Sequence, residues 1–381
     1  MKKVDLIVKN AIVIDSQRDT LDKKDIVINN GIIEADIKEN IIAEQEINAE
    51  GYFLSAGWVD SHVHVFDGGT EAGLHPDVNL IPMGITSVID AGSCGFANWK
   101  IFKDNIVDKS ILDIYYSLNV SPCGQVTGRY PENIDPMYYD FDKLLNILMK
   151  DKVHARGIKL RFGAEVISGE PEVLLDKVIS LANRLNCSLT IHVTNPACNM
   201  NIIANKLRAG DIMCHVYHGT GDTILDQDRN IKSDILKARE RGVFFDSADA
   251  RTNHSYTVMK RAVECNFKPD IISTDLTNES VFGNMCWGLP IILSKWLNLG
   301  LSLSEVIKAC TYTPAKVYKL NNEVGTLNNG AKANITIFKV INKNFKMANR
   351  LGESFEGEKM IVPYVTIIDG NIVYKNVEFP F

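Results

Sequence analysis

Short apolar segments rich in β-branched residues alternate with helix-like stretches through the middle of the chain. The eight segments are WVDSHVHV (58–65), TSVIDAG (86–92), DIYYSLNVS (113–121), ARGIKLRF (155–162), SLTIHVTN (188–195), DIMCHVYHG (211–219), VFFDSAD (243–249) and DIISTDLT (270–277). This alternation predicts a parallel sheet, because parallel strands need a crossover between them, usually a helix such as PEVLLDKVISLANRL. Eight units favour a closed (β/α)8 TIM barrel over an open doubly wound sheet, since no glycine-rich phosphate loop follows the first segment.

The two ends of the chain share a different pattern, in which apolar residues alternate between turn signals. Residues 1–54 contain runs such as DLIVKNAIVID, and residues 325–381 contain NITIFKV and MIVPYVTIIDGNIVYKNV. The pair Asp369-Gly370 between two apolar runs predicts a tight hairpin. We expect both ends to form one small, discontinuous β-sandwich domain beside a barrel domain that spans residues 55–324.

Charge and composition narrow the class of protein. Acidic residues outnumber basic ones by 47 to 41 and no basic block is present, so a nucleic-acid partner is not expected. No apolar run is long enough to span a membrane, and Asp5 and Lys9 interrupt the apolar start. Eight scattered cysteines without a CxxC pair are typical of free thiols in a reducing cytosol. We expect a cytoplasmic protein with a small-molecule substrate, and self-association into a homo-oligomer is left open.

The segment GWVDSHVHV carries two histidines one residue apart at the end of the first predicted strand. His62 and His64 point to the same side, because side chains alternate along a strand. The active sites of such barrels lie at the carboxyl ends of the strands. The pair therefore predicts a metal site, since same-face histidines at that position rarely serve packing alone.

Four later segments add polar residues at corresponding positions. They are Lys159 in the fourth segment, His192 in the fifth, His215 in the sixth and Asp275 in the eighth. Each residue alone has a structural explanation: a hydrogen-bonded core histidine, a lysine that reaches solvent, or an aspartate that caps a helix. Their ordered combination favours a metal site, because imidazole nitrogen and carboxylate oxygen together suit Zn, Mn or Fe.

The strings GWVDSHVHV, GIKLRF, TIHV, GDIMCHVYHG and STDLT resemble the amidohydrolase superfamily of metal-dependent hydrolases. The nearer resemblance is to its dihydroorotase-related amidohydrolase/deacetylase branch. Segments such as GITSVIDAGSCG (84–95) and LPIILSKWLNLGLSLSEVIKACTYTPAKVYKL (289–320) extend the resemblance over nearly the whole chain.

The resemblance implies two divalent metal ions, with Zn as the expected metal. It places His62, His64 and Asp275 on one ion and His192 and His215 on the other. Lys159, carboxylated by CO2, would bridge both. The modification is needed because a free ammonium has no lone pair to offer a metal.

The activity that the resemblance implies is hydrolysis of an amide or ester bond of a small molecule, such as deacetylation of an N- or O-acyl small acid. A metal-bridging hydroxide would attack, and Asp275 would be the catalytic proton shuttle. Opening of a cyclic amide of the dihydroorotase type is an alternative. A metal-free barrel that acts as a binding protein is a third, and retention of all six ligand positions argues against it.

Three further residues are candidates for substrate binding. His218 stands where relatives often have asparagine, and it would contact substrate, compete as a ligand or serve the structure. Asp249 stands where relatives often have a histidine, and its anion would favour a cationic or hydrogen-bond-donating substrate unless Arg251 offsets it. Arg161 would bind a substrate carboxylate or form a salt bridge. His254 is expected at the surface or behind the metal ligands.

Overall fold

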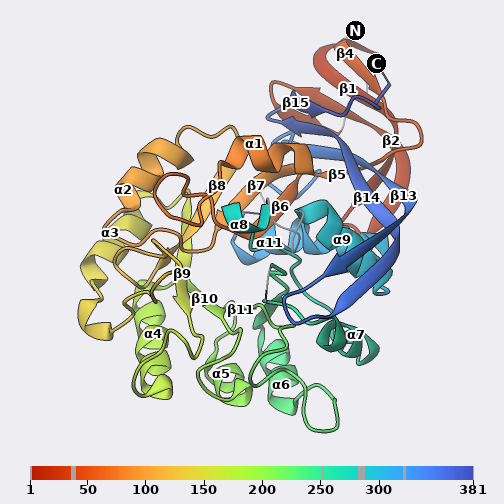
Figure 1. Ribbon diagram of the computed structural model, residues 1–381. Helices are drawn as coiled ribbons and strands as arrows, with labels where there is room; N and C mark the ends of the chain where they lie inside the picture. The colour runs from red at the N-terminus through yellow and green to blue at the C-terminus, as the bar shows by residue number, and fades with distance from the viewer. Residues whose placement is uncertain (1, 36–39, 251, 282–287, 321–322, 381) are drawn as a thin grey trace.

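A seven-stranded parallel sheet forms the centre of the computed structural model, which describes residues 2–35, 40–250, 252–281, 288–320 and 323–380 (Figure 1). Its strands are β6 (Trp58–Val63), β7 (Ile85–Asp90), β8 (Asp113–Asn119), β9 (Ala155–Arg161), β10 (Ser188–His192), β11 (Ile212–Cys214) and β12 (Phe244–Asp246). The strands neighbour one another in sequence order, as expected of repeated strand–helix units. Seven of the eight predicted segments are therefore strands of one parallel sheet.

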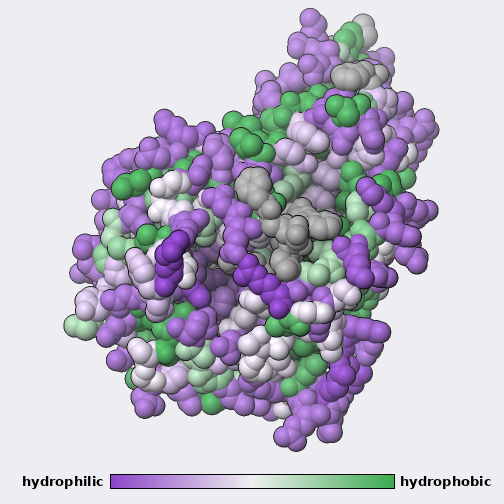
Figure 2. Space-filling view, viewed as in Figure 1, coloured by the Kyte–Doolittle hydropathy of each residue, from purple (hydrophilic) through white to green (hydrophobic). Residues whose placement is uncertain are grey.

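The eighth predicted segment contacts both edges of this sheet. Parallel bridges join Ile271 to Asp246 of β12 and Leu276 to Val63 of β6. These are isolated bridges, in place of the continuous strand predicted for residues 270–277. The sheet is therefore curled, with both edge strands against one segment, in an α/β fold of the TIM-barrel type. The surface of the molecule, seen from the same side as in Figure 1, has a hollow near its middle. Hydrophilic side chains surround this hollow (Figure 2).

Helices follow most of the parallel strands. They are α1 (Pro76–Leu80), α2 (Trp99–Phe102), α3 (Phe141–Lys150), α4 (Pro171–Leu185), α5 (Met200–Lys206), α6 (Ser233–Arg241), α7 (Tyr256–Glu264), α8 (Asn278–Val281), α9 (Leu289–Asn298), α10 (Leu303–Ala309) and α11 (Tyr312–Val317), with the short turns η1 (Ile81–Met83), η2 (Lys103–Val107) and η3 (Pro136–Tyr138). Helix α4 has the bounds that its sequence predicts. It begins at Pro171, which needs no hydrogen bond to its nitrogen, and ends before Asn186 in the left-handed conformation. Within the described residues, no helix has the length and apolarity needed to cross a membrane.

The parallel strands direct alternate side chains to opposite faces. In β9, Ile158 and Leu160 are buried in the apolar core that the helices also line. Lys159, between them, points to the other face and is also buried. A lysine is costly to bury unless it is paired or modified, so its position marks the inner face of the curled sheet as polar and specialised.

A second sheet of eight strands combines both ends of the chain. Its strands are β1 (Lys2–Asp15), β2 (Thr20–Asn29), β3 (Ile32–Glu34), β4 (Ile41–Asn48), β5 (Phe53–Ala56), β13 (Ile335–Ala348), β14 (Ser354–Ile368) and β15 (Asn371–Lys375). Strand β5 joins the two ends by pairing with β1 and β13, and Figure 1 shows the red and blue strands together with both termini close by. The predicted hairpin is present, with Asp369 and Gly370 at positive φ between β14 and β15.

Hydrogen-bond pairing places these eight strands in one continuous sheet, whereas a sandwich has two layers. Strand β5 also extends to Ala56, past the predicted boundary at residue 54. The sandwich and the division into two domains stay predictions.

The long β13–β14 hairpin reaches the parallel-sheet half of the molecule. The backbone nitrogen of Ile361 donates to Oγ of Ser294 in α9 over 2.8 Å. Near the hairpin tip, Glu353 accepts hydrogen bonds from Oγ of Ser255 (2.8 Å) and the nitrogen of Tyr256 (2.7 Å) at the start of α7. The hairpin thereby braces the loop that follows β12, and this loop contributes a residue to the candidate site.

Candidate metal centre

His62, His64 and Asp275 meet where β6 and the eighth segment end. Oδ1 of Asp275 lies 3.2 Å from Nε2 of His64 and 3.6 Å from Nε2 of His62. One potential ligand atom of each residue lies within 4.8 Å of the others, and all three side chains are buried. The structure thus brings together the three residues that the resemblance places on one ion.

Hydrogen bonds orient His64 toward this group. Its Nδ1 contacts Oγ of Ser93 at 2.8 Å, and that hydroxyl donates to Oδ2 of Asp90 at 2.7 Å. Because the hydroxyl proton of Ser93 is donated to Asp90, the hydroxyl oxygen accepts from His64. We therefore assign the imidazole proton of His64 to Nδ1, which leaves a lone pair on Nε2. The sequence did not predict a role for Ser93 and Asp90, because no pattern in it links them to His64.

Lys159, His215 and His192 lie beside the first group. Nζ of Lys159 is 3.1 Å from Nε2 of His62, and the ring centre of His215 is 4.7 Å from that of His62 and 4.3 Å from that of His192. The residues predicted for a second ion therefore adjoin those predicted for the first.

Cys214 is an unexpected neighbour of this centre. Its Sγ lies 3.3 Å from Nζ of Lys159 and, with His62 and His215, forms a second group that could hold a metal ion. Burial raises the pKa of Cys214 to about 12, and its thiol donates to the carbonyl of Ile191 at 3.1 Å. We therefore regard Cys214 as a neutral contact of Lys159. From the sequence it was one of several scattered cysteines.

The backbone around His215 is strained. His215 (φ 64°), Ala248 (φ 40°) and Asp275 (φ 54°) occupy the left-handed region, which is unfavourable for residues with a Cβ and occurs often at functional sites. Nδ1 of His215 lies 2.8 Å from the carbonyl oxygen of Ala248. A carbonyl only accepts, so the proton is on Nδ1 and Nε2 keeps a lone pair.

The surroundings of two histidines of the site favour their neutral form. Burial lowers the pKa of His62 well below its ordinary value, and Lys159 and His215 lower it further. Burial also lowers the pKa of His192, with additional effects from His215 and Lys159. Neutral imidazoles together with one carboxylate match the donors of zinc-type sites. The ammonium of Lys159 fits such a site only after conversion to a carbamate.

Two buried aspartates contact His62 or the residue next to Asp275. Asp60 accepts hydrogen bonds from the nitrogen (3.1 Å) and the hydroxyl (2.5 Å) of Thr274, which ties β6 to the eighth segment. Asp246 accepts from Oγ of Ser273 at 2.7 Å and lies 3.7 Å from Nδ1 of His62. Burial raises the pKa of Asp60 to about 7 and that of Asp246 to about 8.

Asn253, in the loop after β12, holds the second oxygen of Asp275. Its Nδ2 donates to Oδ2 of Asp275 over 2.6 Å, and its Oδ1 accepts from Oγ1 of Thr194 over 2.8 Å. The sequence interpretation missed Asn253, because nothing in a loop sequence shows how far its side chain reaches.

Arg161 makes the salt bridges that were one of its two predicted roles. Nη1 donates to Glu132 and Nη2 to Glu165, both over 3.1 Å. Contact with a substrate carboxylate stays a prediction, and it would require the guanidinium to exchange one of these partners.

Asp249 and His218 are both buried. Oδ2 of Asp249 lies 2.8 Å from Nζ of Lys295 and accepts from Nε1 of Trp296 over 3.0 Å. Arg251, the counter-charge considered from the sequence, lies outside the described residues. Nδ1 of His218 accepts from the nitrogen of Thr220, and burial lowers the pKa of His218 to about 4. Substrate contact by either residue stays a prediction.

His254 is fully buried, so the surface position considered for it is wrong. Neither of its ring nitrogens has a hydrogen-bond partner among the described residues. Its pKa is lowered, first by burial and then by the nearby charge of Lys295. His254 therefore belongs to the buried surroundings of the Asp249–Lys295 pair.

Comparison with known proteins adds independent observations. Residues 162–373 match the model of the amidohydrolase family. A deacetylase from Brucella anthropi is 29% identical over 331 residues, which cover 86% of this chain and 82% of the relative. The crystal structure of an adenine deaminase has a TM-score of 0.88 at 26% identity and covers 98% of this chain and 100% of its own. A dihydroorotase structure has a TM-score of 0.86 at 26% identity, with coverage of 97% and 98%.

These likenesses agree with the resemblance of the strand-end motifs. The matched region includes His192, His215 and Asp275, while His62, His64 and Lys159 precede it. Because the family model covers more than half of the chain, the chain belongs to the amidohydrolase family and is a hydrolase.

Proposed function

We propose that this hydrolase is binuclear and metal-dependent, and that it removes an acyl group, such as acetyl, from an N- or O-acyl small acid. The observation that carries the proposal is the buried convergence of His62, His64 and Asp275 with Lys159 and His215. The relative from Brucella anthropi, named a deacetylase, supports the acyl group as the part that is cleaved.

We assign the ligands to two divalent ions, as the resemblance to metal-dependent hydrolases implies. His62, His64 and Asp275 would hold one, His192 and His215 the other, and Lys159, as a CO2-derived carbamate, would contact both. Bound zinc ions would polarise the acyl carbonyl and lower the pKa of water toward ~7.

The protein's own groups would orient and move the proton. Oδ1 of Asp275 would accept a proton from the attacking water and pass it to the departing nitrogen or oxygen. Asn253 keeps Oδ2 of Asp275 engaged, so that Oδ1 stays toward His62 and His64. The residues needed to accept the proton from water and to deliver it to the departing atom are therefore present in one buried cluster.

We extend the proposal to the architecture around this site. The eighth segment, bridged to β6 and β12, would close the parallel sheet into a (β/α)8 barrel over residues 55–324. The strands of residues 1–54 and 325–381 would form a separate small domain. We also propose that the protein is cytoplasmic, that its substrate is a small molecule and that it forms a homo-oligomer.

Metal analysis and a substrate screen test the function. The purified chain, supplied with zinc and bicarbonate, should hold about two ions and a carbamate on Lys159. It should then hydrolyse one or more N- or O-acetyl small acids, tested as both enantiomers. At most one ion with an unmodified Lys159 would contradict the binuclear assignment.

Opening of a cyclic amide is the second candidate, and the dihydroorotase structure with a TM-score of 0.86 favours it. The same loaded enzyme should be assayed against cyclic amides such as dihydroorotate and hydantoins. Turnover of cyclic amides alone would replace the deacylation proposal. A chain that binds no metal and hydrolyses neither class would instead be a binding protein.

A further inference from the structure

A cavity of about 720 Å³ lies at the end of the parallel sheet opposite to the candidate metal centre. Ala155 and Arg156 at the start of β9, Ser188 at the start of β10 and Gly210 just before β11 border it. The proposed ligands lie further along the same strands, toward their carboxyl ends. This cavity is therefore separate from the site of hydrolysis.

The charge around the cavity is one-sided. Lys152, Arg156, Arg208 and Lys319 line it, and none of the described residues that line it is an aspartate or glutamate. This is notable in a chain whose net charge is −6. The pKa of Cys187 is raised to about 12 by burial and, to a smaller extent, by Asp211, against the opposing effects of Arg208 and Lys319, so both cations lie near that thiol.

One of these cations has a structural role. The guanidinium of Arg208 bonds to Asp211 (3.0 and 2.7 Å), to the side chain of Asn183 (2.6 Å) and to the carbonyl of Cys187 (2.9 Å). These contacts fix the turn before β11. Arg208 thus shapes the cavity wall and has little capacity left for another partner.

The other three cations retain unused capacity. Neither Lys152 nor Lys319 forms a salt bridge with a carboxylate in the described parts of the chain. Arg156 donates from Nη2 to the carbonyl of Val153 and its guanidinium lies over the ring of Tyr115 at 5.4 Å, while its buried Nε has no hydrogen-bond partner among the described residues. A buried donor without a partner is unfavourable, and like charges around one cavity repel, so an anion would relieve both.

The remaining wall is apolar. Leu145, Leu148 and Met149 from α3, Leu185 at the end of α4 and Val317 at the end of α11 contribute side chains to it. A cavity with apolar walls and a few convergent polar groups is the usual form of a small-molecule site. An inorganic anion would leave the apolar part of the wall without a partner.

We propose that this cavity binds a small organic phosphate, with its phosphate near Lys152, Arg156 and Lys319 and its apolar body against the leucines. Cations from two separate parts of the chain, the turn and start of β9 and the residues just after α11, suit a group with several charged oxygens. The site is independent of the proposed hydrolysis, so either proposal stands if the other fails.

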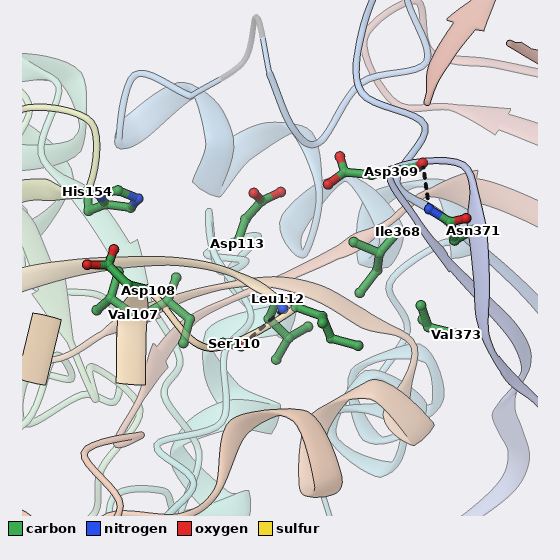
Figure 3. Close-up of a pocket in the computed structure, with 12 residues that line it drawn as sticks. Val107, Asp108, Ser110, Leu112, Asp113, His154, Ile368, Asp369, Asn371 and Val373 are labelled. Carbon is green, nitrogen blue, oxygen red and sulfur yellow. Dashed lines mark hydrogen bonds between the residues drawn. The ribbon is translucent and has the colours of Figure 1, made fainter. Parts of the chain in front are cut away.

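A second cavity, of about 540 Å³, provides a contrast within the same molecule. It lies between the start of β8 and the β14–β15 hairpin, and Figure 3 shows Asp108, Asp113 and Asp369 around it. The carboxylate of Asp113 already accepts hydrogen bonds from Nζ of Lys332 (2.6 Å) and Nδ2 of Asn334 (2.8 Å). Its acidic lining would repel an anion, so this cavity should not take up the same ligand.

Isothermal titration of the zinc-loaded full chain with phenyl phosphate tests the proposal. Lys152→Ala and Lys319→Ala should each weaken binding about threefold and the double variant about tenfold, because each removes one partly exposed charge contact. Lys343→Ala removes an exposed lysine of β13 and should leave the affinity unchanged. Phenol should show no measurable binding, and inorganic phosphate should bind more weakly than phenyl phosphate.

Two results would overturn the proposal. Phenyl phosphate that binds the double variant as tightly as the wild type would be bound elsewhere, for example at the metal centre. Equal affinities for inorganic phosphate and phenyl phosphate would show that the apolar wall does not contribute to binding, and would exclude an organic phosphate as the specific ligand. Both lysines are exposed, so equal melting temperatures should accompany either result.

Discussion

The side-chain amide of Asn253 donates a 2.6 Å hydrogen bond to Oδ2 of Asp275. Asn253 is itself held by Thr194, so the loop after β12 and the segment after β10 both fix this carboxylate. The other oxygen of Asp275 is the one that lies toward His62 and His64. Asn253 is therefore a positioning residue for the proposed proton shuttle.

Replacing Asn253 should slow turnover without emptying the site. We expect Asn253→Ala to lower kcat about tenfold or more, because a hydrogen bond to a charged group contributes about 1.5–3 kcal/mol. KM and metal content should change little. Steady-state kinetics and metal analysis of the same preparations check this, with Asn205→Ala as a control on the exposed surface of α5. Unchanged kcat in Asn253→Ala would remove the positioning role.

Asp275 is expected to be essential for the chemical step. Asp275→Asn keeps the shape and one oxygen ligand but loses the proton acceptor, so kcat should fall by about 10²- to 10⁴-fold. Most of the metal should remain, since five other proposed ligands are intact. Turnover equal to that of the wild type would exclude the shuttle role.

Lys159 should determine the number of metal ions. Lys159→Ala removes the proposed bridging carbamate, so we expect occupancy to fall from about two ions to at most about one per chain. Cys214→Ser is the matched control, because Cys214 contacts Nζ of Lys159 but is not a proposed ligand. Metal analysis, together with a carbon-13 signal from labelled bicarbonate, measures both effects. Full occupancy in Lys159→Ala would contradict the bridge.

The Asp249–Lys295 pair should behave as a buried ion pair. Both side chains have 0% exposure, so Lys295→Met alone should cost about 3–5 kcal/mol by leaving a buried charge without its partner. The double variant Asp249→Asn/Lys295→Met should recover much of this loss. Urea unfolding of the wild type, Asp249→Asn, Lys295→Met and the double variant gives the coupling free energy, and additive effects would argue against a direct pair.

Asp249 also has a predicted effect on substrate choice. Asp249→His should shift the activity profile over acetylated substrates, since it exchanges an anion for the residue type expected in relatives. An identical profile would leave Asp249 with a structural role only.

His218 should make the fold sensitive to acid. Its pKa is about 4 in the folded chain against an ordinary value of 6.5, so between these values the unfolded chain binds more protons. Stability should therefore fall as the pH decreases from 6.5 to 4, by about 3 kcal/mol from this residue. His218→Asn should make this slope smaller, whereas exposed His75→Asn should leave it unchanged. Equal slopes in all three proteins would contradict the buried, neutral state.

Local sequence patterns predicted several elements correctly. Helix α4 has the predicted bounds because its apolar spacing, its initial Pro171 and the left-handed Asn186 are all properties of nearby residues. The hairpin at Asp369-Gly370 follows in the same way from two residues that tolerate positive φ. The spacing of His62 and His64 likewise placed them on one side of a strand end, and the structure brings both to Asp275.

Only the tertiary structure decided which side chains meet. Asp249 pairs with Lys295, Arg161 with Glu132, and Asn253 with Asp275, each across connections whose direction the sequence does not encode. The same holds for the cationic cavity, which brings Lys319, after α11, together with Lys152 and Arg156 near the start of β9. Periodicity and turn preference act over a few residues and are readable in the sequence, whereas contacts between loops depend on where the whole sheet places their ends.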